Sequence, residues 1–372
     1  MYGDPRTDPA AGARNLLLHC LEAKPGERLL LLSEDPADGF YDRHAPEAVA
    51  AAAEAMGLIV ERYKVPFVAD ARDASPDIWE RIGRADCSVF FARLGDQIRF
   101  DRLGAGQRTA MVYAMDAGML GSGYGIASHA GFLKLKSLID AAVSSAEEIR
   151  MTCPLGTDIR GRCPRPKGTG ENGAGGEEDV TIRRFPMAVF KPVPAQSFSG
   201  KVVINRFLTG TGNRYYDPYD LLLGSPVCAH VEAGRVARYE GSPEEVDKVL
   251  RHTAEVGERF GIDPAVVHSW HAGMHPGCAY LPDALDNLAR WGNCAFANPR
   301  ILHFHTCGDY APGEISWNVV DPTIELDGRA AWEDGVLHPE RLAGGAEVLD
   351  LWPDIRAVFA RPRNEIGLRD SV

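Results

Sequence analysis

Histidines gather in the second half of the chain, where five of the eleven lie between positions 268 and 305. They are His268, His271, His275, His303 and His305. Neutral imidazole is the commonest protein ligand for transition metals. Several imidazoles brought to one place would hold Zn²⁺ or Fe²⁺. The clustering therefore predicts metal chemistry in this part of the molecule.

The pair His303 and His305 lies in an apolar stretch that is followed by a glycine, a pattern typical of a strand that ends in a loop. Side chains at positions i and i+2 of a strand share a face, so the two imidazoles point the same way while Phe304 faces opposite. Two imidazoles about 6 to 7 Å apart along a strand can chelate one divalent ion. We expect both to be metal ligands.

The earlier histidines allow two interpretations. On a strand, His271 and His275 share a face, whereas on a helix His268 joins them in one stripe. His271 contributes in either case. Gly273 and Pro276 favour a strand that runs into a loop, and hence His275 over His268 as a second contributor, although both stay open.

Other residues near the histidines could complete a catalytic site. Asp309 and Glu314 could supply a fourth ligand, orient a ligand or act as a general base. Trp270 and Tyr310 could line an aromatic pocket for a substrate ring. Arg160, which precedes a flexible segment, could hold a substrate carboxylate through two hydrogen bonds.

The first half of the chain must provide a support for this site. Helical spacing at 10–20, 44–56, 79–85 and 132–150 alternates with short apolar runs at 27–33, 58–63, 87–91 and 109–114. Such runs are typical of buried parallel strands. We predict an α/β N-terminal domain with an open, mainly parallel sheet over residues 1–150.

The second half of the chain differs in composition and in predicted secondary structure. Residues 164–179 are polar and rich in Gly and Pro, so we expect 151–184 to be a flexible connecting region. Strand-like runs follow 185, and a helix at 243–260 begins with a capping sequence at Ser242. We predict that 185–372 form an α+β domain rich in antiparallel strands that carries the metal site.

One segment points to a known family. The stretch FPMAVFKPVP (185–194), followed by SGKVVI (199–204), resembles the thermophilic metalloaminopeptidases and their offshoot, the 2,5-dihydroxypyridine dioxygenases. In the aminopeptidases the proline-flanked stretch carries a glutamate that binds metal, whereas Met187, Ala188 and Val189 offer no carboxylate here. The resemblance is therefore closer to the dioxygenase branch than to a two-metal peptidase.

The dioxygenase branch implies one Fe(II) held by two histidines and an aspartate, with the last two arranged as His-x-Asp on a strand. The corresponding place in this sequence is His303-Phe-His305, so a histidine takes the position of the aspartate. With His271 the ligand set becomes three histidines. An alternative alignment gives Asp309 the carboxylate role.

We therefore expect a mononuclear non-haem iron dioxygenase-like enzyme that opens a hydroxylated aromatic or N-heteroaromatic ring. Its cofactor would be one divalent metal per chain, Fe(II) before Zn or Mn, and its partners a small aromatic substrate and O₂. The alternative is a metal-dependent hydrolase of the aminopeptidase or amidase type that uses a metal-activated water. A third alternative is a non-catalytic metal-binding scaffold, which the clustered histidines disfavour. The family resemblance also implies that the protein is a homo-oligomer.

Composition excludes other classes of function. The chain has 372 residues with 40 Lys plus Arg against 52 Asp plus Glu, a net charge of -12, so we expect no nucleic-acid partner. No apolar run approaches the roughly 20 residues that span a bilayer, and the N-terminus lacks a signal-peptide pattern. The eight cysteines form no CxxC pair, which disfavours a thiolate zinc site. We expect a cytoplasmic protein.

Overall fold

The computed structural model describes residues 7–101, 106–164, 181–308 and 313–368. Its N-terminal half contains a five-stranded sheet in the order β2-β1-β3-β4-β7, in which every neighbouring pair is parallel. The strands are β1 (Arg28–Ser33), β2 (Ile59–Lys64), β3 (Cys87–Phe91), β4 (Arg108–Val112) and β7 (Arg183–Phe185). The predicted parallel sheet is confirmed.

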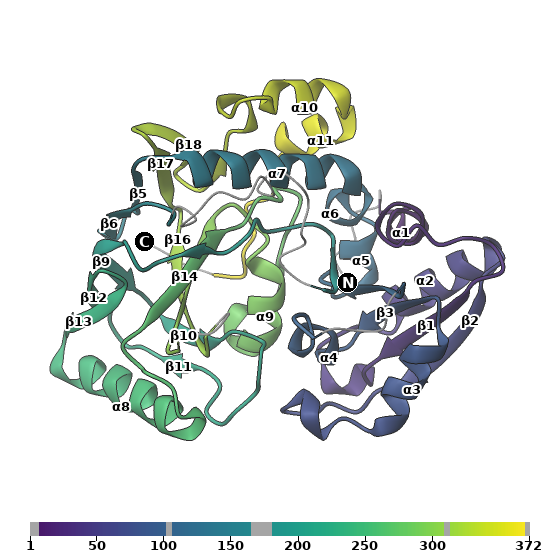
Figure 1. The fold of residues 1–372 in the computed structure, drawn as a ribbon, viewed down its shortest axis with the longest axis horizontal. Helices are drawn as coiled ribbons and strands as arrows, with labels where there is room; N and C mark the ends of the chain where they lie inside the picture. The colour runs from purple at the N-terminus through teal and green to yellow at the C-terminus, as the bar shows by residue number, and fades with distance from the viewer. Residues whose placement is uncertain (1–6, 102–105, 165–180, 309–312, 369–372) are drawn as a thin grey trace.

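Helices cover this sheet (Figure 1). The main ones are α1 (Pro9–Arg14) with the π-helix Asn15–Cys20, α2 (His44–Ala55) and α3 (Pro76–Arg84). Three short helices follow the strands towards the C-terminal half, namely α4 (Leu94–Gln97), α5 (Ala117–Leu120) and α6 (Gly123–Ile126). The helix predicted at 79–85 begins earlier because Pro76 takes the first helical position.

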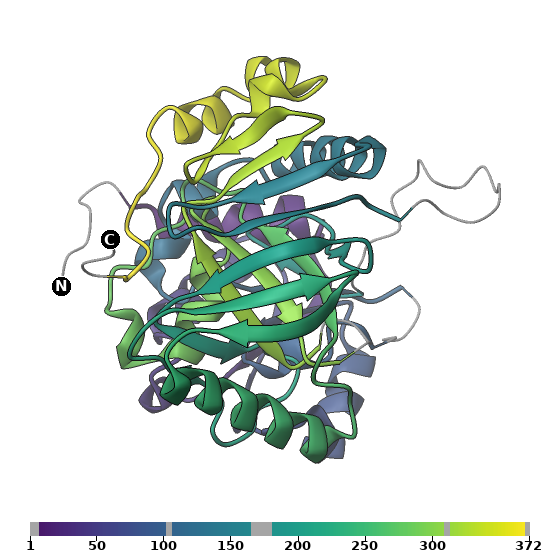
Figure 2. The ribbon, with the colours of Figure 1, turned by 90° about the vertical axis from the view of Figure 1, so that its left-hand side faces the viewer.

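The C-terminal half contains two antiparallel sheets (Figure 2). One has six strands in the order β11-β10-β16-β15-β14-β8. They are β8 (Val193–Pro194), β10 (Phe207–Gly210), β11 (Leu221–Leu222), β14 (Val267–Ala272), β15 (Ile301–Thr306) and β16 (Ile315–Val320). The predicted antiparallel character is confirmed.

The other antiparallel sheet has eight strands in the order β13-β12-β9-β6-β5-β17-β18-β19. They are β5 (Ile149–Thr152), β6 (Asp158–Gly161), β9 (Ser199–Ile204), β12 (Val227–Glu232), β13 (Arg235–Glu240), β17 (Thr323–Leu326), β18 (Arg329–Glu333) and β19 (Val336–Leu337). The described ends of the predicted connecting region 151–184 thus include strands β6 and β7, and most of the Gly- and Pro-rich stretch lies outside the described residues.

Five further helices are α7 (His129–Ser145), α8 (Pro243–Phe260), α9 (Leu288–Ala295), α10 (Gly345–Leu351) and α11 (Pro353–Phe359), and short 3₁₀ turns lie at Pro36–Asp38, Ala71–Asp73, Ala284–Asp286 and Pro339–Arg341. Helix α8 has the predicted bounds, since Ser242 caps its start and Gly261, with a φ of 63°, ends it. Among the described residues, no helix is long and apolar enough to cross a membrane.

Two hydrophobic cores result. One fills the parallel sheet and its helices and also takes in Trp291 of α9. The other lies between the two antiparallel sheets, where Trp270, Phe304 and Trp317 pack with residues of β9 and β12. The six-stranded sheet therefore buries one face against the eight-stranded sheet, and its other face is turned towards the N-terminal half.

Candidate metal centre

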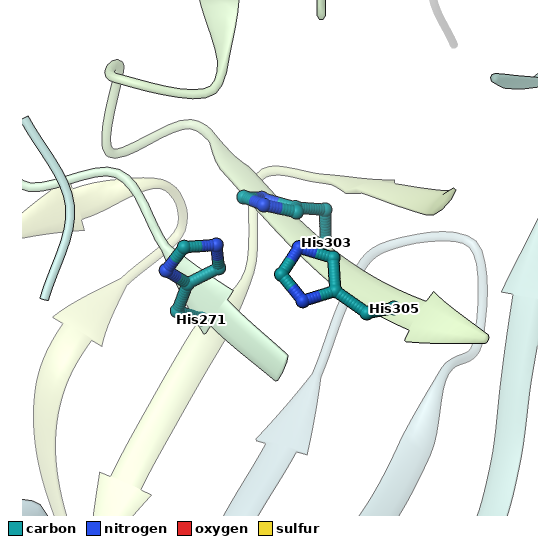
Figure 3. Close-up of side chains that lie close together, drawn as sticks. All are labelled: His271, His303 and His305. Atoms are coloured by element: carbon teal, nitrogen blue, oxygen red, sulfur yellow. The ribbon is translucent and has the colours of Figure 1, made fainter. Parts of the chain in front are cut away.

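Three histidines meet on two neighbouring strands of the six-stranded sheet (Figure 3). In the antiparallel register of β14 and β15, His271 is paired with His303, and His305 follows two residues further along β15. One nitrogen from each of the three rings lies within 4.8 Å of the others. The centroid distances are 4.2 Å between His271 and His303 and 5.0 Å from each of these to His305.

The alternation of side chains along the strands produces this arrangement. Trp270 and Phe304 point into the core between the antiparallel sheets and are fully buried. Their strand neighbours must therefore point to the opposite face. The apolar residues between the histidines thus fix the face on which His271, His303 and His305 lie.

Hydrogen bonds orient two of the three rings. His271 Nδ1 lies 3.0 Å from the carbonyl oxygen of Phe190, to which it donates as the protonated nitrogen. In that tautomer His271 carries its lone pair on Nε2. His305 Nδ1 is 3.1 Å from Ser269 Oγ, which is in turn 2.8 Å from His268 Nδ1.

Burial keeps His303 and His305 neutral. The pKa values of His303 and His305 lie well below the usual value, first because the rings are desolvated and then because His271 and nearby guanidinium groups repel a second positive charge. Among the described residues, the buried Nδ1 of His303 has no hydrogen-bond partner. A neutral, desolvated imidazole nitrogen is the form in which histidine binds a metal.

The three imidazoles form a donor set for one divalent ion. Metal–nitrogen bonds of about 2.0–2.1 Å place ligand nitrogens about 3.0–3.4 Å apart. Side-chain rotations would therefore have to bring the nitrogens closer than their present spread of up to 4.8 Å. The chemistry of three imidazoles suits Zn²⁺ and Fe²⁺ better than Mg²⁺ or Ca²⁺, which prefer oxygen ligands.

A cavity of about 90 Å³ opens beside the triad between the two halves of the molecule. This is several times the roughly 10–15 Å³ that one water requires. Besides the histidines, the polar side chains of its lining are those of Asp96, Arg99, Tyr113, Tyr124, Arg184, Thr211 and Asn293. Phe296 also lines the cavity and stacks on His303 with centroids 4.0 Å apart.

The proline-flanked stretch 185–194 also reaches this cavity, since Ala188, Val189 and Pro192 belong to its lining. The segment that carries the family resemblance therefore lies at the site. It contributes a backbone carbonyl to His271 and no carboxylate.

The N-terminal half supplies charged groups that sequence reasoning missed. Asp96 lies 3.3 Å from Arg99 and accepts a hydrogen bond of 2.8 Å from Tyr113 Oη. Burial and the neighbouring Asp96 raise the pKa of Tyr113, so its hydroxyl stays protonated. Arg184 of β7 is buried against the same cavity. In the sequence these residues look like ordinary surface charges, and no local pattern distinguishes them.

The predicted catalytic carboxylates are not among the described lining residues. Glu314 is fully buried and accepts a hydrogen bond of 3.0 Å from Arg214 Nε. Its pKa is raised by burial, against the opposing effect of Arg214. Glu314 thus forms an ion pair with Arg214, whose guanidinium also lies 3.9 Å from the ring centroid of Phe260. Asp309 lies outside the described residues.

His275 does not join the triad. Strand β14 ends at Ala272, and His275 follows in a turn where it stacks on Phe132 with centroids 3.9 Å apart. Its Nδ1 accepts a hydrogen bond of 3.2 Å from the Gly277 N–H. The assignment as a metal ligand assumed that the strand continues, and the early end of β14 removes that premise. Instead, His268 approaches the triad through Ser269.

Two of the three predicted substrate contacts, Trp270 and Arg160, lie away from the cavity. Trp270 is on the opposite face of β14, where it packs against Phe190 and Phe198 and is fully buried. Arg160 lies on β6 of the eight-stranded sheet, is half exposed and pairs with Glu148 at 3.9 Å. Neither lines the cavity. Tyr310 lies outside the described residues.

The fold and the site together define a class of protein: a parallel α/β half, a double layer of antiparallel strands, and a buried three-histidine candidate metal centre between them. No family model matches the chain, and no curated protein matches it. Among solved structures, it is similar to the 2,5-dihydroxypyridine dioxygenase from Pseudomonas putida KT2440, with a TM-score of 0.55 and 12% identity over 88% of this chain and 96% of the other.

A second similar structure is AmpT from Thermus thermophilus, with a TM-score of 0.47 and 11% identity over 87% of this chain and 98% of the other. The chain thus shares the fold of the dihydroxypyridine dioxygenase along most of its length. The resemblance that the sequence suggested is confirmed at the level of the fold.

Proposed function

We propose that this protein is a mononuclear metal-dependent enzyme in which His271, His303 and His305 hold one divalent metal, Fe(II) before Zn or Mn. Its reaction would open the ring of a small hydroxylated aromatic or N-heteroaromatic compound with O₂. The observation that carries the proposal is the cluster of three buried imidazoles beside a cavity with an aromatic wall. The shared fold of the dihydroxypyridine dioxygenase supports the choice of reaction.

His271, His303 and His305 would hold the iron, which would supply the redox chemistry that allows O₂ to react with an aromatic ring. The chain's own residues would bind and orient the substrate. Phe296 offers a ring against which an aromatic substrate packs. Asp96 is the one carboxylate among the described lining residues. We therefore assign it the role of general base, which accepts the proton released by a substrate hydroxyl.

The test is oxygen consumption. Protein loaded anaerobically with Fe(II) should take up O₂ when it is mixed with members of a panel of dihydroxypyridines and catechols. His303→Ala should lose both the bound iron and the O₂ uptake, because only two imidazoles remain to hold the metal. His44→Ala, which changes an exposed histidine of α2, is the matched control and should retain both. Iron-loaded protein that consumes no O₂ across the whole panel would overturn the proposal.

A hydrolase is the second candidate, and the ligand set is what favours it. Three neutral histidines are the set that holds a zinc-bound hydroxide in known zinc enzymes. This candidate predicts turnover of amide or peptide substrates without O₂. Metal analysis of protein purified without added metal separates the two: one iron per chain favours the dioxygenase, and zinc with O₂-independent hydrolysis favours the hydrolase.

A further inference from the structure

A chain of two hydrogen bonds runs from His305 away from the other two histidines of the triad. His305 Nδ1 lies 3.1 Å from Ser269 Oγ, and the same oxygen lies 2.8 Å from His268 Nδ1. Ser269 is 1% exposed and is paired with His305 in the register of β14 and β15. One buried hydroxyl therefore links a proposed metal ligand to a histidine outside the triad.

A β-bulge in β14 brings His268 to this position. The register of β14 against β15 shifts between Val267 and Ser269, so His268 is the extra residue. Because of the bulge, Val267 and Trp270 belong to the same hydrophobic core, although regular alternation would put them on opposite faces of the sheet. Bulges re-aim side chains and are frequent next to active sites. Here the bulged residue is the one that extends the hydrogen-bond chain.

The single hydroxyl proton of Ser269 gives the chain two possible directions. The hydroxyl can donate to His268 Nδ1 or to His305 Nδ1, and the other ring must then donate to it. If Ser269 donates to His268, His305 carries its proton on Nδ1 and its lone pair on Nε2. If Ser269 donates to His305, the proton of that ring lies on Nε2. Only the first direction leaves His305 Nε2 able to bind a metal.

We infer that Ser269 and His268 are positioning residues that keep His305 in the tautomer that binds metal. Since they act on a ligand of the proposed metal centre, the inference rests on the proposed function. His305 donates to Ser269, and Ser269 donates to His268, which is the final acceptor. Without this acceptor the hydroxyl donates to His305 Nδ1 instead and favours the tautomer with the proton on Nε2. His268 should thus control metal affinity although it is not a ligand.

Zn²⁺ affinity, measured by competition with a chromophoric chelator, tests the inference. Ser269→Ala and His268→Leu should each weaken binding about 10- to 100-fold, the usual effect of removing a partner of a ligating histidine. His268→Asn should bind nearly as tightly as the wild type, because its amide oxygen can accept in place of Nδ1. The double variant Ser269→Ala/His268→Leu should bind no more weakly than Ser269→Ala, since His268 acts only through the hydroxyl.

Ser316 provides a matched control on the other side of His305. It is fully buried on β16, is paired with His305 in the register of β15 and β16, and its hydroxyl lies 3.3 Å from Asn318 Oδ1. Ser316→Ala should therefore leave the Zn²⁺ affinity unchanged. If Ser269→Ala fails to fold, the two variants of the partly buried His268 still test the inference.

Nitrogen NMR of the metal-free protein with ¹⁵N-labelled histidine measures the tautomer itself. His305→Gln identifies the signals of His305 among those of the eleven histidines. The ring proton should lie on Nδ1 in the wild type and move to Nε2 in His268→Leu. A merely structural role of His268 would not move this proton.

The outcomes separate the inference from the proposed function. Unchanged Zn²⁺ affinity in Ser269→Ala, or losses that multiply in the double variant, would overturn the inference and leave the metal centre standing. The same holds if His268→Asn binds as weakly as His268→Leu, or if His305 of the wild type carries its proton on Nε2. Wild-type protein that binds no Zn²⁺ would instead overturn the metal centre and the inference with it.

Discussion

Burial holds several histidines of this protein in the neutral form. Besides two members of the triad, His275 has its pKa lowered to about 3 and His129 to about 4, in both cases mainly through desolvation. In the unfolded chain these rings take up a proton near pH 6.5. The neutrality that suits a metal centre therefore comes with sensitivity to acid.

Stability should fall as the pH drops below about 6.5. Below that value these histidines bind protons in the unfolded state but stay neutral in the folded state. The free energy of unfolding therefore decreases until the pH reaches the folded-state pKa. For His275, with a folded pKa of about 3, the loss between pH 7 and 5 is about 2 kcal/mol. His275→Asn, which keeps an acceptor for the Gly277 N–H, should lower the pH dependence by that amount.

Urea unfolding of the metal-free protein at several pH values measures this slope. His275→Asn loses the stacking contact with Phe132 and will be less stable at pH 7, so the readout is the change with pH and not the stability itself. His44→Asn alters an exposed ring and serves as the control. An unchanged slope in His275→Asn would show that this ring does not cause the acid sensitivity.

At the level of single residues, the sequence pattern predicted part of the candidate site. The i, i+2 spacing of His303 and His305 sufficed, since alternation along a strand is a local property. Asp96, Arg99 and Arg184 could not be found, because burial of a charged residue depends on segments far away in the sequence that pack over it.

Strand ends matter as much as strand faces for the candidate site. At the end of β14, Gly273 forms an isolated bridge with Val189, its N–H donates to the Ile301 carbonyl at 3.0 Å, and its own carbonyl accepts from Trp332 Nε1 at 3.0 Å. These contacts continue the pairing of β14 by one residue, and beyond Gly273 the chain leaves the strand, so His275 stacks on Phe132 instead of joining the triad. Nothing in the sequence near Gly273 specifies these partners.

Gly273→Ala should therefore disturb the strand that carries His271. An added Cβ would lie 2.1 Å from the carbonyl oxygen of Asn298, so the backbone must shift. We expect a loss of about 1–3 kcal/mol in the free energy of unfolding, with weaker metal binding. Gly83→Ala on α3 is the control, because an added Cβ there meets no atom within 4 Å. Equal unfolding midpoints in urea for the two variants would contradict the argument.

Helix ends show the same contrast between local and distant causes. The bounds of α8 could be predicted because Ser242, Pro243 and Gly261 mark them within the segment itself. The helix predicted at 132–150 instead ends at Ser145, since residues from Ile149 onwards form β5. Strand β5 pairs with β17, more than 170 residues away, and periodicity cannot reveal that pairing.

The two halves of the molecule are joined by more than the cavity. The chain returns to the parallel sheet at β7 after β5 and β6 have entered the eight-stranded sheet. Trp291 of α9 belongs to the N-terminal core and donates to the Ile366 carbonyl at 2.7 Å, while Arg290 Nε donates to the Phe40 carbonyl at 2.8 Å. We therefore do not expect the predicted domains, residues 1–150 and 185–372, to unfold separately.

We expect one cooperative unfolding transition whose midpoint rises when Zn²⁺ binds. Free metal at 100 times its Kd adds about 2.7 kcal/mol to the stability of the folded state, which for a chain of this length is a shift of roughly 3–4 °C. Scanning calorimetry should show this shift in the wild-type protein and not in His303→Ala. Because shared core and backbone contacts tie the halves together, the metal stabilises the parallel sheet as well as the strands that bind it. Two transitions, of which only one responds to Zn²⁺, would show instead that the junction is too weak to couple the halves.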